Sequence, residues 1–144
     1  MTTTENNRVL TDTTVQEANK AVVRKYVSAF NQGDTETLQQ LFAPDALIYG
    51  VLGWGKILEV VPVWQELHAA FAIELNIESI IAEGDTVAVR YTERGTFRRP
   101  FRGKEPTGRS YELVAMEWFV LRKGRIECRW GARDAASQTR QLNM

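Results

Sequence analysis

The sequence lacks most of the groups that metal, redox and nucleotide chemistry require. Its 144 residues include one cysteine, Cys128, and one histidine, His68, so an internal disulfide is excluded and a zinc site has too few soft ligands. No GxGxxG, GxxxxGKS/T or GxSxG pattern is present, which removes the usual sequence support for dinucleotide, P-loop and hydrolase-elbow chemistry. We therefore expect neither a metal nor a cofactor.

An excess of charge of one sign is also lacking, since 18 lysines and arginines balance 18 aspartates and glutamates. This balance argues against electrostatic binding to nucleic acid or to an acidic membrane. No window approaches the roughly 18 apolar residues that cross a bilayer, and the polar first residues lack the apolar stretch of a signal peptide. With a free thiol as well, we expect a cytoplasmic protein with no nucleic-acid or membrane partner.

Helical signals dominate the first half of the chain. Thr14 and Glu17 match a capping box, and apolar residues then recur at helical spacing until Gly33 ends the helix. Asp34 is placed to cap a short second helix. A third helix is expected over about residues 57–71, with either a kink at Pro62 or a true start near Val61.

Strand signals dominate the second half, and the tail from Asp134 to Leu142 is expected to form a turn of helix. The predicted strands are 46–49, 75–82, 86–96, 111–121 and 125–130, and the predicted loops are 50–56, which is rich in glycine, and 97–108.

Helices followed by a meandering antiparallel sheet predict an α+β domain. We expect residues 1–12 to form a flexible arm and residues 13–144 to form one domain, in which a curved sheet wraps around the helices. Such a sheet leaves an apolar pocket with one open mouth, which is the default place for a small apolar ligand.

Motifs between about residues 15 and 142 resemble the SnoaL-like polyketide cyclases of the nuclear transport factor two superfamily. The resemblance implies a cone-shaped α+β barrel, a cofactor-free enzyme and a homodimer. It rests on AFNQGD at 29–34, LFAPD at 41–45, PTGRSY at 106–111, GRI at 124–126, Trp130-Gly131, Asp134 and Gln141-Leu142.

The resemblance also implies where the chemistry lies. These cyclases use a His–Asp pair, and the Asp corresponds to Asp134, whereas the His position holds Glu117. The implied reaction is intramolecular aldol-type ring closure of a polyketide-like carbonyl substrate. In that reaction Asp134 abstracts a proton next to a carbonyl group, and Tyr49, Arg94 or protonated Glu117 stabilises the enolate oxygen.

The segment from Tyr91 to Arg94, together with PTGRSY, also resembles limonene epoxide hydrolase. That family uses an Asp-Arg-Asp constellation, whose Arg corresponds to Arg94 and whose second Asp corresponds to Asp134. The first Asp corresponds to Thr96, which cannot act as a carboxylic acid. Epoxide opening, with Asp134 and Glu117 as the acid and base, is therefore a second hypothesis.

Each candidate catalytic residue also has a structural interpretation. Asp134 could lie on the pocket wall or could cap the terminal helical turn. Strand alternation places Glu117 on one face, directed either into the pocket or toward solvent and a partnering arginine. Arg94 could balance a pocket carboxylate or be an exposed strand-edge residue, and Tyr49 could bind a substrate oxygen or be a half-buried core residue.

Five further residues are expected to contact the substrate. Trp54, between two glycines, suits a lid at the pocket mouth or a plug that closes the cone. Phe30 belongs to the apolar stripe of the first helix, Ala115 and Phe119 share a strand face with the central glutamate, and Trp130 ends the last predicted strand.

A third hypothesis is a binding or interaction protein that keeps the fold without catalysis. Met116 and Trp118 lie on the strand face opposite the pocket, and this position suits a subunit interface between two copies of the chain.

Overall fold

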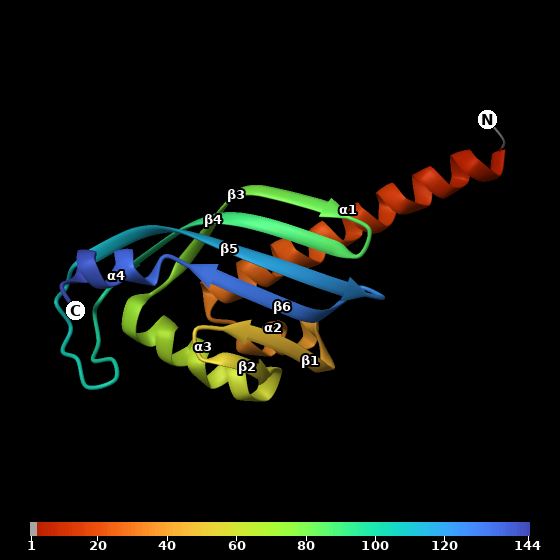
Figure 1. Ribbon diagram of the computed structural model, residues 1–144. Coiled ribbons are helices and arrows are strands. Elements are labelled where there is room, and N and C mark those ends of the chain that lie inside the picture. Colours follow the sequence, from red (N-terminus) through yellow and green to blue (C-terminus); the bar gives the residue numbers. More distant parts are fainter. Residues whose placement is uncertain (1–2) are drawn as a thin grey trace.

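Four helices and a six-stranded sheet make up the chain, in a computed structural model that describes the backbone of residues 3–144 and the side chains of residues 13–144 (Figure 1). The elements are α1 (Thr3–Gln32), α2 (Thr35–Leu41), β1 (Phe42–Gly50), β2 (Gly53–Lys56), α3 (Ile57–Phe71), β3 (Glu74–Glu83), β4 (Thr86–Thr96), β5 (Ser110–Arg122), β6 (Arg125–Arg133) and α4 (Ala135–Leu142).

The first helix is longer than the sequence predicted. It begins at Thr3, so the expected start at Thr14 is wrong, and the helix takes in most of the segment assigned to an arm. No proline or glycine interrupts residues 3–13, so nothing in the backbone chemistry stops the helix there. Residues 1 and 2 lie outside the described part, and the division into an arm and a domain stays a prediction. Within residues 3–144, no helix is long and apolar enough to span a membrane.

The start of α2 follows the predicted chemistry. Asp34 caps α2, because its carboxylate accepts hydrogen bonds from the backbone nitrogen of Thr37 at 3.1 Å and from its hydroxyl at 2.7 Å. These bonds hold the pKa of Asp34 below its usual value. The third helix spans the predicted residues 57–71.

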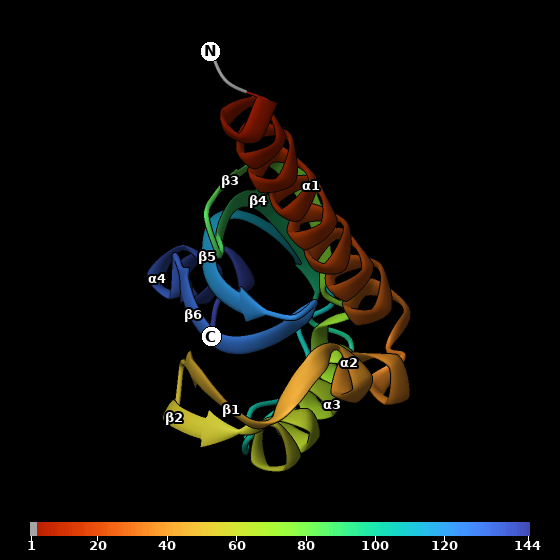
Figure 2. The same cartoon turned by 90° about the vertical axis from the view of Figure 1, so that its right-hand side faces the viewer.

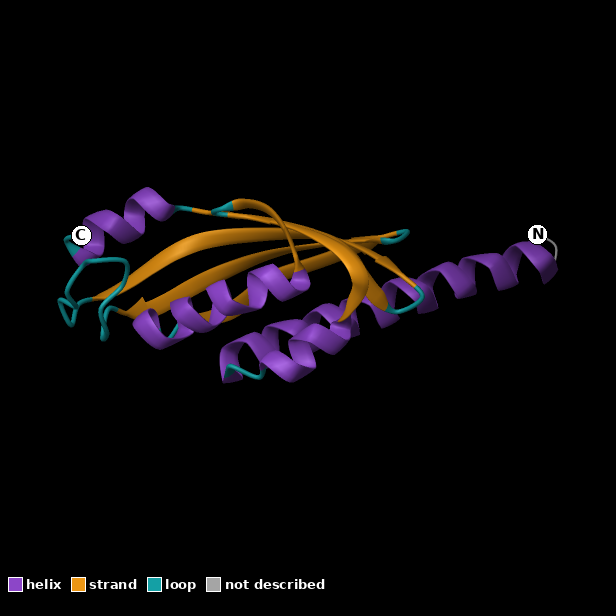
Figure 3. Cartoon of the chain, turned by 90° about the horizontal axis from the view of Figure 1, so that it is seen from below, coloured by secondary structure: helices purple, strands orange, loops and turns teal. Residues whose placement is uncertain are grey.

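The sheet is mixed, with the strand order β2-β1-β6-β5-β4-β3. Strands β3 to β6 form the predicted antiparallel meander, whereas β1 pairs with β6 in parallel, so the expectation of a wholly antiparallel sheet is wrong. The sheet curves around α1 (Figure 2), and the long helices lie across one of its faces while α4 lies at its end (Figure 3). This arrangement confirms the α+β fold class.

The glycine-rich segment 50–56 is a hairpin instead of a loop. Tyr49 pairs with Trp54 across it, and Gly53 has φ +89°, a conformation that glycine adopts without strain. The sequence does not show this strand, because β2 has only four residues and two of them are glycine.

Strand β5 alternates as predicted, with its odd-numbered residues 111–121 buried on the concave face. The helices cover this face. Tyr26 of α1 is the centre of an aromatic cluster, with its ring 5.2 Å from that of Phe119 and 6.1 Å from that of Trp64. The burial of this concave face creates both the hydrophobic core and the surroundings of the candidate site.

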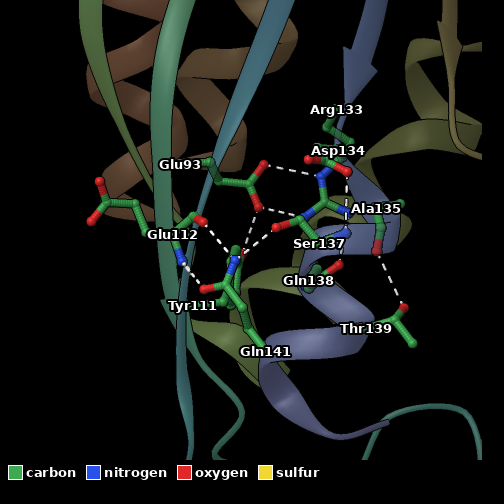
Figure 4. Close-up of polar contacts among 10 residues, drawn as sticks. All are labelled: Glu93, Tyr111, Glu112, Arg133, Asp134, Ala135, Ser137, Gln138, Thr139 and Gln141. Atoms are coloured by element: carbon green, nitrogen blue, oxygen red, sulfur yellow. Dashed lines mark hydrogen bonds and ion pairs between the residues drawn. The ribbon is translucent and has the colours of Figure 1, made fainter.

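Two side-chain amides extend the hydrogen bonding of the sheet beyond its strands. The Asn31 amide bonds to both backbone groups of Leu75, with distances of 2.7 and 2.9 Å. The Gln141 amide does the same for Glu112, at 2.8 and 2.9 Å, which fastens α4 to β5 (Figure 4). Each amide replaces the neighbouring strand that is missing at its position.

The substitution Gly95→Ala is expected to lower the free energy of unfolding by about 1–3 kcal/mol. A Cβ at Gly95 would lie 2.7 Å from the carbonyl oxygen of Phe71 and 2.6 Å from the ring of Tyr111. Urea denaturation measures the loss, with the exposed neighbour substitution Arg94→Ala as the control, which should change stability by no more than about 0.5 kcal/mol. Equal stability of Gly95→Ala and the wild type would refute this packing argument.

Candidate active site

A cavity of about 130 Å³ lies between the concave face of the sheet and the helices. Its walls come from α1, α3, the strands β1 and β3 to β6, and the turn at 51–53. Most of the wall is apolar, and the polar groups in it come from two glutamates, two arginines and two tyrosines. This combination of apolar walls and a few convergent polar groups is typical of a small-molecule site.

Glu117 is the buried carboxylate in the first polar cluster. Its Oε2 accepts a hydrogen bond from Nη1 of Arg129, and the Tyr26 hydroxyl lies 3.1 Å from Oε2 and 3.2 Å from Oε1. Both members of the ion pair are more than nine-tenths buried. Gly131, which pairs with Glu117 across the strands, leaves room for them, since a Cβ there would lie 2.7 Å from Arg129 Nη1.

Glu93 is the buried carboxylate in the second cluster (Figure 4). Arg133 donates from Nε to its Oε1 at 3.0 Å and from Nη2 to its Oε2, and the Tyr111 hydroxyl donates to Oε2 at 2.5 Å. Arg133 also donates from Nη1 to the side-chain oxygen of Gln138 at 2.9 Å, which links the cluster to α4. Burial and the charge of Glu93 raise the pKa of Tyr111, so its hydroxyl stays protonated.

Two buried polar groups in the cavity wall have no hydrogen-bond partner among the described residues. They are the hydroxyl of Tyr91, whose side chain is only 1% exposed, and Nε of Arg129. Burial raises the pKa of Tyr91, and the neighbouring Tyr26 raises it further, so Tyr91 stays a hydrogen-bond donor. Buried polar groups are normally paired, so these two unpaired donors beside the cavity are exceptions that require an explanation.

The sequence profile of the SnoaL-like polyketide cyclases matches residues 20–142. The chain belongs to the SnoaL-like polyketide cyclase family. A comparison with proteins of curated function gave no match.

One solved structure of similar fold is IdmH, a proposed polyketide cyclase from Streptomyces antibioticus. It is 31% identical to this chain, the match covers 88% of this chain and 99% of IdmH, and the TM-score is 0.78. AclR, a proposed hydroxylase from Streptomyces galilaeus, has 25% identity over 89% of this chain and 86% of its own, with a TM-score of 0.81. An epoxide hydrolase of the limonene type from Mycobacterium tuberculosis is 15% identical, and the match covers 89% of this chain and 91% of that one. Its TM-score of 0.72 at this identity shows the shared fold alone. Family membership supports a catalytic role.

In this member of the SnoaL-like family, Asp134 does not lie on the cavity wall. It is exposed and caps α4, with its carboxylate accepting from the backbone nitrogen of Ser137 at 3.1 Å (Figure 4). The expected position at the pocket is therefore corrected in favour of the cap. The physical reason is that β6 ends at Arg133, whose side chain takes the inward position next to the strand end.

Three predicted residues do line the cavity. They are Glu117 and Ala115, side by side on the inner face of β5, and Phe30 of α1. Phe119 shares the inner face but is completely buried in the core beneath Tyr26, so it is not part of the wall.

The other four predicted residues lie on the convex face of the sheet. Arg94 is exposed and pairs with Glu112 at 3.2 Å. The ring of Trp54 lies there between the other two, tilted against Tyr49 at a centroid distance of 5.1 Å and edge-to-face with Trp130 at 5.9 Å, so Trp54 is not part of the cavity wall. Trp130 faces outward because strand alternation gives the inward position to its neighbour, Arg129.

The convex face also carries Met116 and Trp118, which are 53% and 52% exposed. Their exposure agrees with the strand face assigned to them from the sequence. The homodimer stays a prediction.

The sequence interpretation missed the groups that surround Glu117 and Glu93. Arg129 and Arg133 stand at alternate positions of β6, a pattern that places both on one face of the strand. Tyr26 and Tyr91 follow apolar patterns, which hide their hydroxyl groups among core residues. Within the described part of the chain, no cluster of metal-ligand side chains occurs.

The substitution Asp134→Ala is expected to lower the free energy of unfolding by about 1 kcal/mol, because it removes the cap of α4. Asp134→Asn should cost much less, since an asparagine side chain accepts the same hydrogen bond. Chemical denaturation of both variants tests the assignment. An equal loss in the two variants would mean that the charge of Asp134, and not its capping hydrogen bond, stabilises the protein.

Proposed function

We propose that the protein is a cofactor-independent cyclase or isomerase that closes a ring in a polyketide-like carbonyl substrate by an aldol-type reaction, with Glu117 as the proton-transfer group. The observation that carries the proposal is the position of an ion-paired carboxylate beside an unpartnered tyrosine hydroxyl in an apolar cavity. The family membership supports the same reaction class.

Glu117 is the better base of the two buried glutamates. Both oxygens of Glu93 receive donors from Arg133, and one also receives the hydroxyl of Tyr111. In contrast, the contact of Glu117 Oε1 among the described residues is with the Tyr26 hydroxyl at 3.2 Å, and that hydroxyl also contacts Oε2. Its remaining lone pair is available to a proton on the substrate.

The proposed donors for the enolate are the hydroxyl of Tyr91 and the guanidinium of Arg129. Removing a proton from carbon next to a carbonyl group moves negative charge onto the carbonyl oxygen. A protonated phenol and a fixed positive charge in a cavity that excludes water stabilise this charge more than they would in solution. The free Nε of Arg129 supplies a second donor.

The ring-closing sequence then balances within one substrate molecule. Glu117 takes a proton from the carbon, and the enolate carbon attacks a second carbonyl group of the same chain. A carbon–carbon bond forms, and the new alkoxide recovers the proton from Glu117. The apolar walls formed by Phe30, Trp64 and Leu67 would hold the chain folded for this attack.

Epoxide opening is the second candidate, because the cavity contains two carboxylates. It requires one protonated carboxyl group to donate to the epoxide oxygen and one ionised group to activate the nucleophile. Both Glu93 and Glu117 form ion pairs with arginines, so each carboxyl group already accepts hydrogen bonds and neither is placed as a donor to an epoxide oxygen. Ring closure, which needs one ionised carboxylate, therefore fits the site better.

Proton abstraction by Glu117 can be measured as hydrogen–deuterium exchange at carbon 1 of 2-tetralone in D2O, followed by NMR. The wild type should accelerate the exchange above the buffer rate. Glu117→Gln should lose about 10²–10⁴-fold of this acceleration, because the amide cannot accept the proton. Glu112→Gln, on the exposed side of the same strand, is the matched control and should retain it.

Glu117→Gln leaves Arg129 without its counter-charge, so folding must be checked by circular dichroism. If that variant unfolds, the double variant Glu117→Gln with Arg129→Met removes both charges, and its exchange rate is compared with that of Arg129→Met, because Arg129 is itself a proposed donor. Exchange by a folded Glu117 variant at the wild-type rate, or no acceleration by the wild type, would refute the proposal.

A further inference from the structure

A second cavity of about 130 Å³ lies where the turn between α1 and α2 meets α3. It is separate from the candidate active site, because among the described residues the two cavities share only Phe30 and Trp64. Figure 2 shows α2 beside α3 at the end of α1, where this cavity is found. Its other lining residues are Gly33, Thr35, Leu38, Gln65, His68 and Ala69.

The second cavity has a buried end and an open mouth. Leu38 and Trp64 are 1% and 7% exposed and form its inner end, whereas Gly33, Gln65 and Ala69 are exposed and form its mouth. A small molecule can therefore enter from the solvent between the α1–α2 turn and α3. The proposed ring-closing reaction uses none of the residues that belong to this cavity alone.

His68 lines the second cavity and carries a polar atom that is not satisfied. Its Nδ1 is buried and has no hydrogen-bond partner among the described residues. The ring is held against the α1–α2 turn, since a Cβ at Gly33 would lie 3.2 Å from His68 Nε2. Burial of an unpaired polar atom costs free energy, and a ligand group that bonds to Nδ1 would recover it.

The size and the chemistry of the lining define the kind of occupant. An apolar cavity of about 150 Å³ holds one benzene ring. The rings of Phe30 and Trp64, which lie edge to face at a centroid distance of 6.1 Å, and the Leu38 side chain offer contacts to an aromatic ring. The described lining includes no lysine, arginine, aspartate or glutamate, so an ionised ligand would find no counter-charge from these residue types.

We infer that this cavity is a second binding site, which takes an uncharged single-ring phenol whose hydroxyl bonds to Nδ1 of His68. A hydroxyl suits the imidazole in either tautomer, because it can both donate and accept a hydrogen bond. The inference does not depend on the proposed function. A phenol bound here would contact Phe30 and Trp64, the two side chains that also line the candidate active site.

Phenol and toluene, which differ by a hydroxyl in place of a methyl group, test the site in an NMR titration. His68 is the only histidine of the chain, so its ring protons give a signal that needs no separation from others. The methyl groups of Leu38 report on the same cavity, since Leu38 does not line the other one. Phenol should shift both signals and saturate them with a dissociation constant of about 1 mM.

The substitution His68→Phe keeps a flat ring and removes the nitrogen. It should weaken phenol binding about tenfold, because the buried hydroxyl loses its partner, and should change toluene binding by no more than about twofold. The Leu38 methyl signals measure both constants. The matched control is Tyr91→Phe, which removes the unpartnered hydroxyl of the candidate active site and should leave the phenol constant at its wild-type value.

Intermolecular nuclear Overhauser effects from phenol to the Leu38 methyl groups locate the ligand in the wild type, so the test stands even if His68→Phe does not fold. Absence of a saturable shift at Leu38 up to about 20 mM phenol, twenty times the expected constant, would overturn the site. Equal weakening of phenol and toluene in His68→Phe, or weakening of phenol in Tyr91→Phe, would overturn it as well. None of these outcomes changes the deuterium-exchange test of Glu117.

Discussion

The buried ion pair between Glu117 and Arg129 is the interaction on which the site depends. Removing a carboxylate and a guanidinium from water costs several kcal/mol for each ion, so the pair persists only with good geometry and further partners. The Tyr26 hydroxyl contributes a hydrogen bond, and the ring of Trp64 faces the guanidinium at 5.5 Å. As a result, the Glu117 carboxylate is held in a fixed position in the wall of an apolar cavity.

The fold supplies this pair from distant parts of the chain. Glu117 and Arg129 occupy inward-facing positions on the neighbouring strands β5 and β6. Tyr26 comes from α1 and Trp64 from α3. Gly131 leaves room for the ion pair, because a side chain at this position would occupy the space of the Arg129 guanidinium. The Glu93–Arg133 pair repeats the arrangement four residues along the strands, so two polar rows divide an otherwise apolar wall.

Local patterns predicted the parts that local chemistry decides. Alternation in β5 placed Glu117 on one face with Ala115 and Phe119 but did not decide whether that face meets the pocket or solvent, and Asp34 caps a helix as expected. The functional partners could not be predicted in this way, since Glu93 and Arg133 are far apart in the chain and meet only when β4, β5 and β6 pair. The parallel contact of β1 with β6 has the same origin, because it joins strands from opposite halves of the chain.

Aromatic residues were the main source of error. Tyr49 and Trp130 were expected at the pocket, Tyr49 because its hydroxyl could bind a substrate oxygen, yet both pack on the convex face beside Trp54. The inward positions of β6 hold two arginines, which sequence patterns place at the surface in most proteins. The charged residues are buried here because each meets a glutamate in the cavity wall.

A structure of the protein with a bound enolic polycyclic ketone would test the central claim most directly. The account predicts that the enol oxygen lies within hydrogen-bond distance of the Tyr91 hydroxyl, and that the neighbouring carbon faces Oε1 of Glu117. A ligand seated on the convex face, or one whose oxygen contacts neither Tyr91 nor Arg129 inside the cavity, would contradict it.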